Sequence, residues 1–205
     1  MERGGLGRKV SPQISMEPNP DYDVSETLAK IFRDCANEDG DNPNYYINRK
    51  NWGKILACAT THSLASQVDN FPLVIFEIDY SIKKNKSLQC VGFVLAVEKA
   101  RGKNLPQCGH AKDFADCHAI NKSSSQYQYS DDCLNVSAGT VAVNSSGKYG
   151  HIGIVSHVSE IGQPQVRFVS AWGTDSNQGG VITIQPYILS ADEFCHKFDT
   201  FIKSK

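Results

Sequence analysis

The chain lacks the features that mark several large classes of protein. Its 205 residues hold 21 Lys and Arg against 22 Asp and Glu, and no long run of one sign gives the electrostatic footprint of a nucleic-acid-binding protein. The nearest basic stretch, Lys83, Lys84 and Lys86, is short and typical of a solvated turn. Charged residues interrupt every apolar run before it reaches the ~18 positions that a membrane helix needs. We therefore expect a soluble protein with no nucleic-acid partner and no membrane span.

The chain also begins without a recognisable export signal. Residues 1–23 contain no apolar segment after their charges, so a standard secretory signal is not visible. We therefore expect either a piece of a longer protein or a protein that leaves the cytoplasm by another route.

Cysteine is scarce and its count is odd. Seven cysteines are too few for a small disulfide scaffold, and no two have the C-x-x-C spacing of a structural zinc site, so we expect no metal and no cofactor. If every cysteine that can pair does so, one thiol is left over and is a candidate for reactivity. A disulfide between Cys35 and Cys58 is an alternative to simple burial in the core. Two of Cys108, Cys117 and Cys133 are expected to close a loop, with the choice of pair left open.

Composition divides the chain into three parts. Residues 1–22, rich in Gly, Pro, Asn and Ser, cannot bury enough apolar surface to order themselves and indicate a flexible tail or linker. Residues 23–80 open with helical periodicity and are expected to form a helical extension that packs on the rest of the chain. Within them the dense apolar run FPLVIFEIDYS, residues 71–81, predicts a buried strand. Residues 81–205 are expected to form the main domain.

The order of the predicted elements indicates a segregated α+β fold. Short strands alternate with turn signals in the last third of the chain, over residues 139–144, 150–161, 165–173 and 181–186. Helices are predicted around them, over residues 23–36, 51–67, 87–102 and 190–202. Ser87 is the expected cap of the third helix, and Ser190 or Asp192 of the last. Helices first and consecutive hairpins afterwards favour an antiparallel sheet over parallel βαβ units.

The segment SLQCVGFVLAVEKARG places Cys90 at the start of the apolar third helix. Unpaired N–H groups and the helix dipole favour negative charge at that point, which lowers the pKa of a thiol. A buried structural cysteine at the start of a core helix is the alternative. Cys90 is therefore a candidate nucleophile that needs a base.

His151 lies between a glycine-rich turn and an alternating strand in GKYGHIGIVSHV. Gly150 and Gly153 would allow another backbone or a substrate to approach the imidazole closely. A neutral imidazole within hydrogen-bond reach of a thiol can take its proton and later give a proton to an amine leaving group. Cys90 and His151 together would be the minimum apparatus for splitting an amide through an acyl-thioester.

The segments QCVGFVLAV, GHAKDFAD, GTVAV and GKYGHIGIV, in this order, resemble the CHAP family of cysteine- and histidine-dependent amidohydrolases and peptidases. The resemblance covers residues 82–190 and leaves the earlier part of the chain unexplained. It implies a papain-like α+β fold, in which a core helix carrying the cysteine packs on an antiparallel sheet carrying the histidine. It also implies Cys90 as nucleophile and His151 as general base, with no metal or cofactor.

The chain departs from the family pattern at the residue that orients the imidazole. Family members commonly place Glu, and Asn two positions later, on the strand after the histidine strand, where this chain has QVRFVSAWGTDSN. Strand register favours Ser170 for this role. Chemistry favours Asp175, because a carboxylate would fix the tautomer and stabilise the imidazolium. His110 and Phe114 also replace the Asn and Trp that the family usually has in GHAKDFAD.

Further candidates surround this predicted site. The backbone N–H of Cys90 and the side chain or backbone of Gln89 are expected to donate to the oxyanion, with a surface role as the alternative for Gln89. Trp172 and Tyr149 are candidate substrate-binding residues because aromatic rings stack on sugar and peptide planes, with plain packing as the alternative for Trp172. His110 is a third substrate-binding candidate.

The resemblance implies peptidoglycan as substrate, cleaved either between muramic acid and L-Ala or within the peptide stem or cross-bridge, and a secreted or cell-wall-associated protein. Two other functions stay open. An amidase for a small non-wall amide or thiol conjugate is favoured by the missing export signal. A catalytically inactive wall-binding or assembly module is favoured by the missing Glu and Asn.

Overall fold

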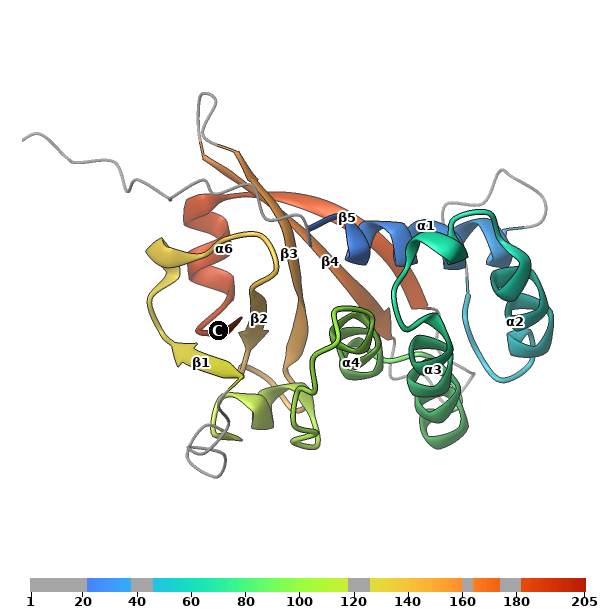
Figure 1. Cartoon of the computed structure of the whole chain (residues 1–205). Helices are drawn as coiled ribbons and strands as arrows, with labels where there is room; N and C mark the ends of the chain where they lie inside the picture. The colour runs from blue at the N-terminus through green and yellow to red at the C-terminus, as the bar shows by residue number, and fades with distance from the viewer. Residues whose placement is uncertain (1–21, 38–45, 118–125, 160–163, 174–181) are drawn as a thin grey trace, which may run out of the picture.

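A six-stranded antiparallel sheet runs through the molecule (Figure 1). The computed structural model describes residues 22–37, 46–117, 126–159, 164–173 and 182–205. In chain order the strands are β1 (Tyr127–Ser130), β2 (Val141–Asn144), β3 (His151–Ser159), β4 (Gln165–Gly173), β5 (Ile182–Ser190) and β6 (Thr200–Ser204). Across the sheet they follow the order β1-β6-β2-β3-β4-β5. The four strands predicted in the last third of the chain are thus confirmed as β2, β3, β4 and β5.

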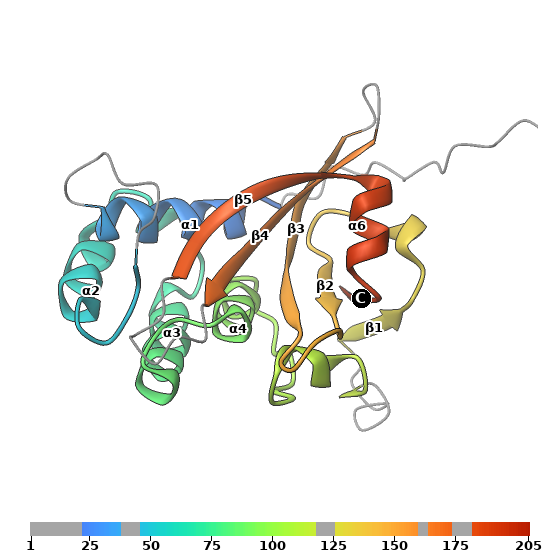
Figure 2. The same ribbon diagram turned by 180° about the vertical axis from the view of Figure 1, so that it is seen from behind.

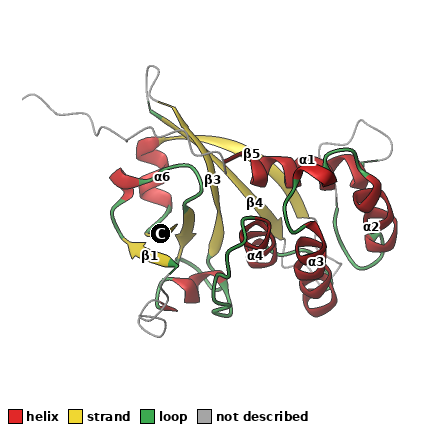
Figure 3. Cartoon of the chain, viewed as in Figure 1, coloured by secondary structure: helices red, strands yellow, loops and turns green. Residues whose placement is uncertain are grey.

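Helices cover both faces of this sheet (Figures 2 and 3). α6 (Ala191–Lys197) lies on one face, and the other face carries α4 (Cys90–Ala100), α1 (Tyr22–Ala36), α2 (Trp52–Thr61) and α3 (Phe71–Asn85). Short 3-10 turns are η1 (Ala65–Gln67), η2 (Ala111–Phe114) and η3 (Cys133–Asn135). Among the described residues, none of the helices combines the length and apolarity needed to cross a bilayer. The predicted α+β class is confirmed.

Each face of the sheet has its own apolar core. α4 is buried over most of its circumference and packs against β3 and β4 through residues such as Ile154 and Val169. On the opposite face the Phe168 ring of β4 contacts Phe194 and Phe198, with ring centroids 6.2 and 4.6 Å apart. Because α4 is fully enclosed, its N-terminus is held in a fixed place relative to β3 and β4.

The predicted strand over residues 71–81 is wrong, because this segment belongs to α3. The side chains it buries recur at helical spacing and do not alternate: Val74, Ile78, Ser81 and Ile82. Pro72 lies in the first turn, where its missing N–H costs no hydrogen bond. Leu73, Phe76 and Tyr80 are exposed on the other side. The apolar density that predicted a buried strand therefore comes from two opposite faces of a helix.

The start of α4 also differs from the sequence prediction. Gln89, and not Ser87, is the N-cap residue, so the helix begins at Cys90. Ser87 forms an isolated bridge with Asn48, and its Oγ accepts a hydrogen bond of 2.9 Å from the Gln89 amide. Just before Cys90, Ser87 is therefore tied to Asn48 and Gln89 to Ser87.

The predicted closing helix over residues 190–202 is too long. Ser190 caps α6 as one of the two predicted candidates, accepting a hydrogen bond from the Glu193 N–H. The helix ends at Lys197, and the Asp199 N–H then donates to a carbonyl of β2 at 2.9 Å. The chain continues as β6 between β1 and β2, a pairing across distant segments that no local pattern indicates.

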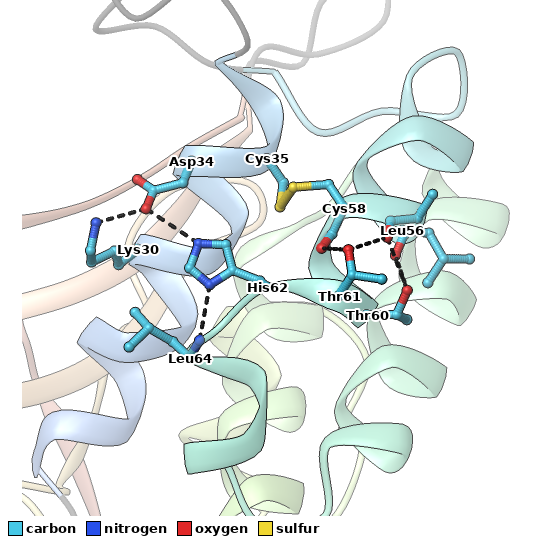
Figure 4. Close-up of a disulfide and its surroundings, with 10 residues drawn as sticks. Lys30, Asp34, Cys35, Leu56, Cys58, Thr60, Thr61, His62 and Leu64 are labelled. Atoms are coloured by element: carbon cyan, nitrogen blue, oxygen red, sulfur yellow. Dashed lines mark hydrogen bonds and ion pairs between the residues drawn. A yellow bond between two sulfur atoms is a disulfide. The ribbon is translucent and has the colours of Figure 1, made fainter.

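The N-terminal helices share the core of the sheet. α1 packs against β3, β4 and β5 and contacts α4. Figure 4 shows the disulfide Cys35–Cys58 that joins α1 to α2. Next to it, Asp34 lies 3.4 Å from His62 Nε2, and His62 Nδ1 accepts a hydrogen bond from the Leu64 N–H. The helical extension is therefore fastened both to the sheet and within itself.

Disulfides use six of the seven cysteines: Cys35–Cys58, Cys108–Cys117 and Cys133–Cys195. The first bridge is the pair that the sequence allowed, and the second is one of the pairs left open. Cys195, which was not among the considered partners, takes Cys133. Cys90 alone keeps a free thiol.

We predict unequal contributions from two of these bridges. Cys133–Cys195 closes 62 residues and Cys108–Cys117 closes 9. Chain entropy then gives a loss of about 4 kcal/mol of unfolding free energy for C133S/C195S and about 2.5 kcal/mol for C108S/C117S. Denaturant unfolding of the oxidised proteins measures both. The opposite order would contradict the chain-entropy account.

Candidate active site

The free thiol of Cys90 lies at the N-terminus of α4, against the start of β3. Gln89 is extended, and its side chain makes no capping hydrogen bond to the helix. The backbone N–H groups of Ile152, Val91 and Cys90 itself act on the sulfur and lower the pKa of the thiol. Because Ile152 directly follows His151, this geometry brings the thiol to the strand end that carries the imidazole.

His151 is the first residue of β3 and follows a turn that requires glycine. Gly150 has a φ of +69°, and a Cβ there would lie 2.6 Å from both the Asn144 carbonyl oxygen and the Lys112 nitrogen. Asn144 is the partner of His151 across β2 and β3. The close backbone approach expected beside the imidazole is thus present on its N-terminal side.

Ser170 on β4 contacts the imidazole directly. A hydrogen bond of 2.6 Å joins Ser170 Oγ and His151 Nε2, and Ser170 is fully buried. Gly153 leaves room for this contact, since a Cβ there would lie 2.6 Å from Ser170 Cβ and would collide with the Phe168 ring. Asp175, the other predicted orienting residue, lies outside the described residues. With Nε2 engaged by Ser170, Nδ1 is the ring nitrogen left to face a thiol.

Burial sets the protonation states of the pair. Burial raises the pKa of the Cys90 thiol above its ordinary value of 9.0, and the N–H groups that contact the sulfur only partly offset this. Burial, and then the positive charge of Lys197, lower the pKa of His151 from 6.5 to about 4. The N–H groups at the helix start do lower the pKa of Cys90, as expected, but burial outweighs them. At neutral pH the pair is a thiol and a neutral imidazole.

An aromatic wall with one cation borders the imidazole. The Trp172 ring stacks on His151 with centroids 4.0 Å apart, and Tyr187 lies 6.0 Å from Trp172. Lys197 Nζ lies 5.6 Å from both the Trp172 and the Tyr187 ring centroids. Tyr187 and Lys197 were not predicted as site residues, because strand pairing and the position of α6 bring them here from distant segments.

The remaining predicted residues lie around this centre. The rings of His110 and Tyr149 contact each other, with centroids 5.0 Å apart. Tyr149 lies two residues before the start of β3. The Gln89 N–H donates to Ser81 Oγ at 3.4 Å and its amide to Ser87 Oγ at 2.9 Å. Gln89 is therefore held by Ser81 of α3 and by Ser87 of the preceding loop, and its role as an oxyanion donor stays a prediction.

A cavity of about 790 Å³ lies beside α6 and shares Lys197 with the aromatic wall. Its other lining residues include Asp131, Glu193 and Asp199, but neither Cys90 nor His151. In the described part of the chain no group of three or more His, Cys, Asp or Glu side chains is arranged to hold a metal ion.

The comparison with protein-family models agrees with the sequence resemblance. Residues 80–171 match the family model of the CHAP domain, a family of papain-like cysteine- and histidine-dependent amidohydrolases. The solved structure titled "The crystal structure of Ly7917" is similar with a TM-score of 0.37 and 14% identity, over 57% of this chain. The chain spans about half of that protein, 53% of its length. No curated protein matches this chain. The family match confirms the predicted resemblance and the papain-like class.

The free protein should keep Cys90 protonated across the neutral range. Because burial raises the pKa of the thiol above 9.0, thiolate absorbance should develop only on the alkaline side of that value. A pH titration of the ultraviolet absorbance, with Cys90→Ser as the blank, measures it. A Cys90-dependent step below neutral pH would instead demonstrate a thiolate–imidazolium pair.

The two candidates for the orienting residue separate by mutation. Ser170→Ala removes the hydroxyl bonded to His151 Nε2, so kcat should fall roughly tenfold with KM little changed. Asp175→Ala should leave kcat near that of the original protein if Ser170 is the orienting residue. Thermal unfolding of both variants controls for stability. An unchanged kcat in Ser170→Ala together with a strongly reduced kcat in Asp175→Ala would assign the role to the carboxylate.

Proposed function

Since residues 80–171 of this chain match the family model of the CHAP domain, we propose that the protein is a cysteine-dependent peptidoglycan hydrolase that cleaves an amide through an acyl-thioester. The observation that carries this proposal is the placement of the one free thiol, Cys90, against the strand end that carries His151. A thiol and an imidazole held together in this way meet the requirements of nucleophilic amide cleavage.

The proposed first step is attack by Cys90 sulfur on the carbonyl carbon of the amide. His151 Nδ1 takes the thiol proton as the C–S bond forms, because His151 is neutral above pH ~4 and Cys90 is protonated. The Cys90 N–H at the helix start donates to the oxyanion. Ser170 holds the ring through Nε2. Proton transfer thus accompanies attack, and no preformed thiolate is required.

The second step breaks the C–N bond and releases the amine. His151 gives its proton to the departing nitrogen, which leaves an acyl group on the Cys90 sulfur. Water, deprotonated by the same imidazole, then attacks the thioester, and the carboxylic acid and the free thiol are regenerated. Trp172 limits the movement of the imidazole through both steps by stacking on it at 4.0 Å.

The three disulfides support a place of action outside the cytoplasm. Cys35–Cys58, Cys108–Cys117 and Cys133–Cys195 need an oxidising environment to form and persist. A secreted or wall-associated enzyme meets its peptidoglycan substrate in such an environment. Amide bonds of small molecules outside the wall remain the alternative substrates for the same residues.

One observation favours a second function, binding to the wall without turnover. Ser170 is neutral, so it orients the imidazole but adds no negative charge to stabilise the imidazolium. A slow or inactive site that retains substrate affinity would then serve as a wall-binding module. Incubation with peptidoglycan distinguishes binding without turnover from hydrolysis.

Incubation of the purified protein with peptidoglycan tests the proposed function. We expect soluble fragments with new amino termini, identified by mass spectrometry, and their loss in Cys90→Ala and His151→Ala, since each variant lacks a reacting group. Sedimentation of the protein with the wall, without release of fragments, would assign the binding module. Release that persists in Cys90→Ala would contradict the site.

A further inference from the structure

The outer face of α3 is apolar and exposed. Leu73, Phe76 and Tyr80 have exposed fractions of 51%, 64% and 44%. Their spacing of three and four residues puts them in one stripe along the helix, opposite the side that packs on α4. α4 lies between α3 and the sheet, so this stripe faces away from the core (Figures 1 and 2). Three large apolar side chains are thus exposed on one helix without a role in the fold.

The acidic residues of α3 are neutralised by basic neighbours. Glu77 is largely covered and lies 3.9 Å from Lys99 Nζ. Asp79 pairs with Lys83 at 2.6 Å and accepts a hydrogen bond of 2.9 Å from Trp52 Nε1. The apolar stripe therefore has little uncompensated negative charge beside it.

Exposed cations gather at the C-terminal end of the same helix: Arg49, Lys50, Lys83, Lys84 and Lys86. Of these, Lys83 is paired with Asp79. The Arg49 N–H donates to the Lys86 carbonyl at 2.9 Å, and its guanidinium bonds the Lys83 carbonyl, which fixes the preceding loop here. Lys84 Nζ lies 5.9 Å from the Tyr80 ring, so the cations adjoin the apolar stripe. In a chain of net charge -1 this cluster is a local concentration.

We propose that the outer face of α3 and the cluster of Arg49, Lys50, Lys83, Lys84 and Lys86 dock the protein on an anionic lipid surface. Exposed Leu and Phe side chains enter the boundary between headgroups and acyl chains, and basic side chains pair with anionic headgroups. A soluble anionic polymer would match the charges but leave Phe76 and Leu73 in water. A protein groove would cover the apolar stripe but has no need of five clustered cations.

The basic cluster lies close to Cys90 along the chain. Three residues, Ser87, Leu88 and Gln89, separate Lys86 from Cys90 and lead from the cluster into α4. The docking does not depend on the chemistry of Cys90, so it can be tested independently of the proposed hydrolase activity.

Vesicle sedimentation with the full chain tests the proposal. Wild-type protein should sediment with phosphatidylglycerol-containing vesicles more than with pure phosphatidylcholine vesicles, and less as salt is raised. K84Q/K86Q should weaken the partition coefficient roughly thirty-fold, since each lost cation near the surface costs about fivefold. F76Q should weaken it roughly five- to tenfold by loss of the inserted ring.

Matched controls remove lysines and an exposed apolar side chain at positions outside α3. K103Q/K205Q removes the same charge from one partly exposed and one exposed position. I188Q replaces an apolar residue of β5 that is 60% exposed. Both variants should bind like wild type. Circular dichroism checks the fold of each variant. The proposal is overturned if wild-type protein sediments no more with anionic than with neutral vesicles. It is equally overturned if the controls lose as much binding as the α3 variants. It is also overturned if soluble poly(glycerol phosphate) binds as tightly and F76Q has no effect, which would assign the face to an anionic polymer.

Discussion

The packing of α4 across β3 and β4 is the contact on which the site depends. α4 is enclosed on nearly all sides, with Phe93, Val94, Ala96 and Val97 fully buried. This burial brings the helix N-terminus, and with it Cys90, to the end of β3 where His151 begins the strand. A shift of the helix would separate the sulfur from the backbone of Ile152 and so from the imidazole. The reactive geometry is thus a consequence of the core.

The same burial has an electrostatic cost. Enclosing the sulfur raises the pKa of Cys90, and enclosing the ring, next to Lys197, lowers the pKa of His151 to about 4. Both changes disfavour a thiolate–imidazolium pair in the free protein. A mechanism in which the proton moves as the carbonyl is attacked fits these states. The neutral Ser170 hydroxyl fits them as well, because a neutral imidazole needs orientation more than charge.

Local patterns predicted the parts of this structure that depend on local chemistry. An apolar helix after Gln89 and a strand after Gly150 were readable in the sequence, and they place Cys90 and His151. The helix α3 was misread, because exposed Phe76 and its neighbours raised the apolar density to that of a strand. Local patterns could not predict contacts between segments that are distant in the sequence. Examples are the pairing of β6 between β1 and β2 and the position of α6, which brings Lys197 to the imidazole. Ser170 was one of two candidates, since register alone could not exclude a carboxylate in the following turn.

The central claim is that Cys90 forms a covalent acyl intermediate. Acid quenching of the protein with a soluble muropeptide, followed by intact-protein mass spectrometry and peptide mapping, tests it directly. We expect a transient mass increase equal to the acyl fragment, located on Cys90, bound as a thioester that hydroxylamine cleaves, and more populated in a variant with slowed deacylation. Turnover of the same substrate with no adduct on Cys90, or with the adduct on another residue, would contradict the account.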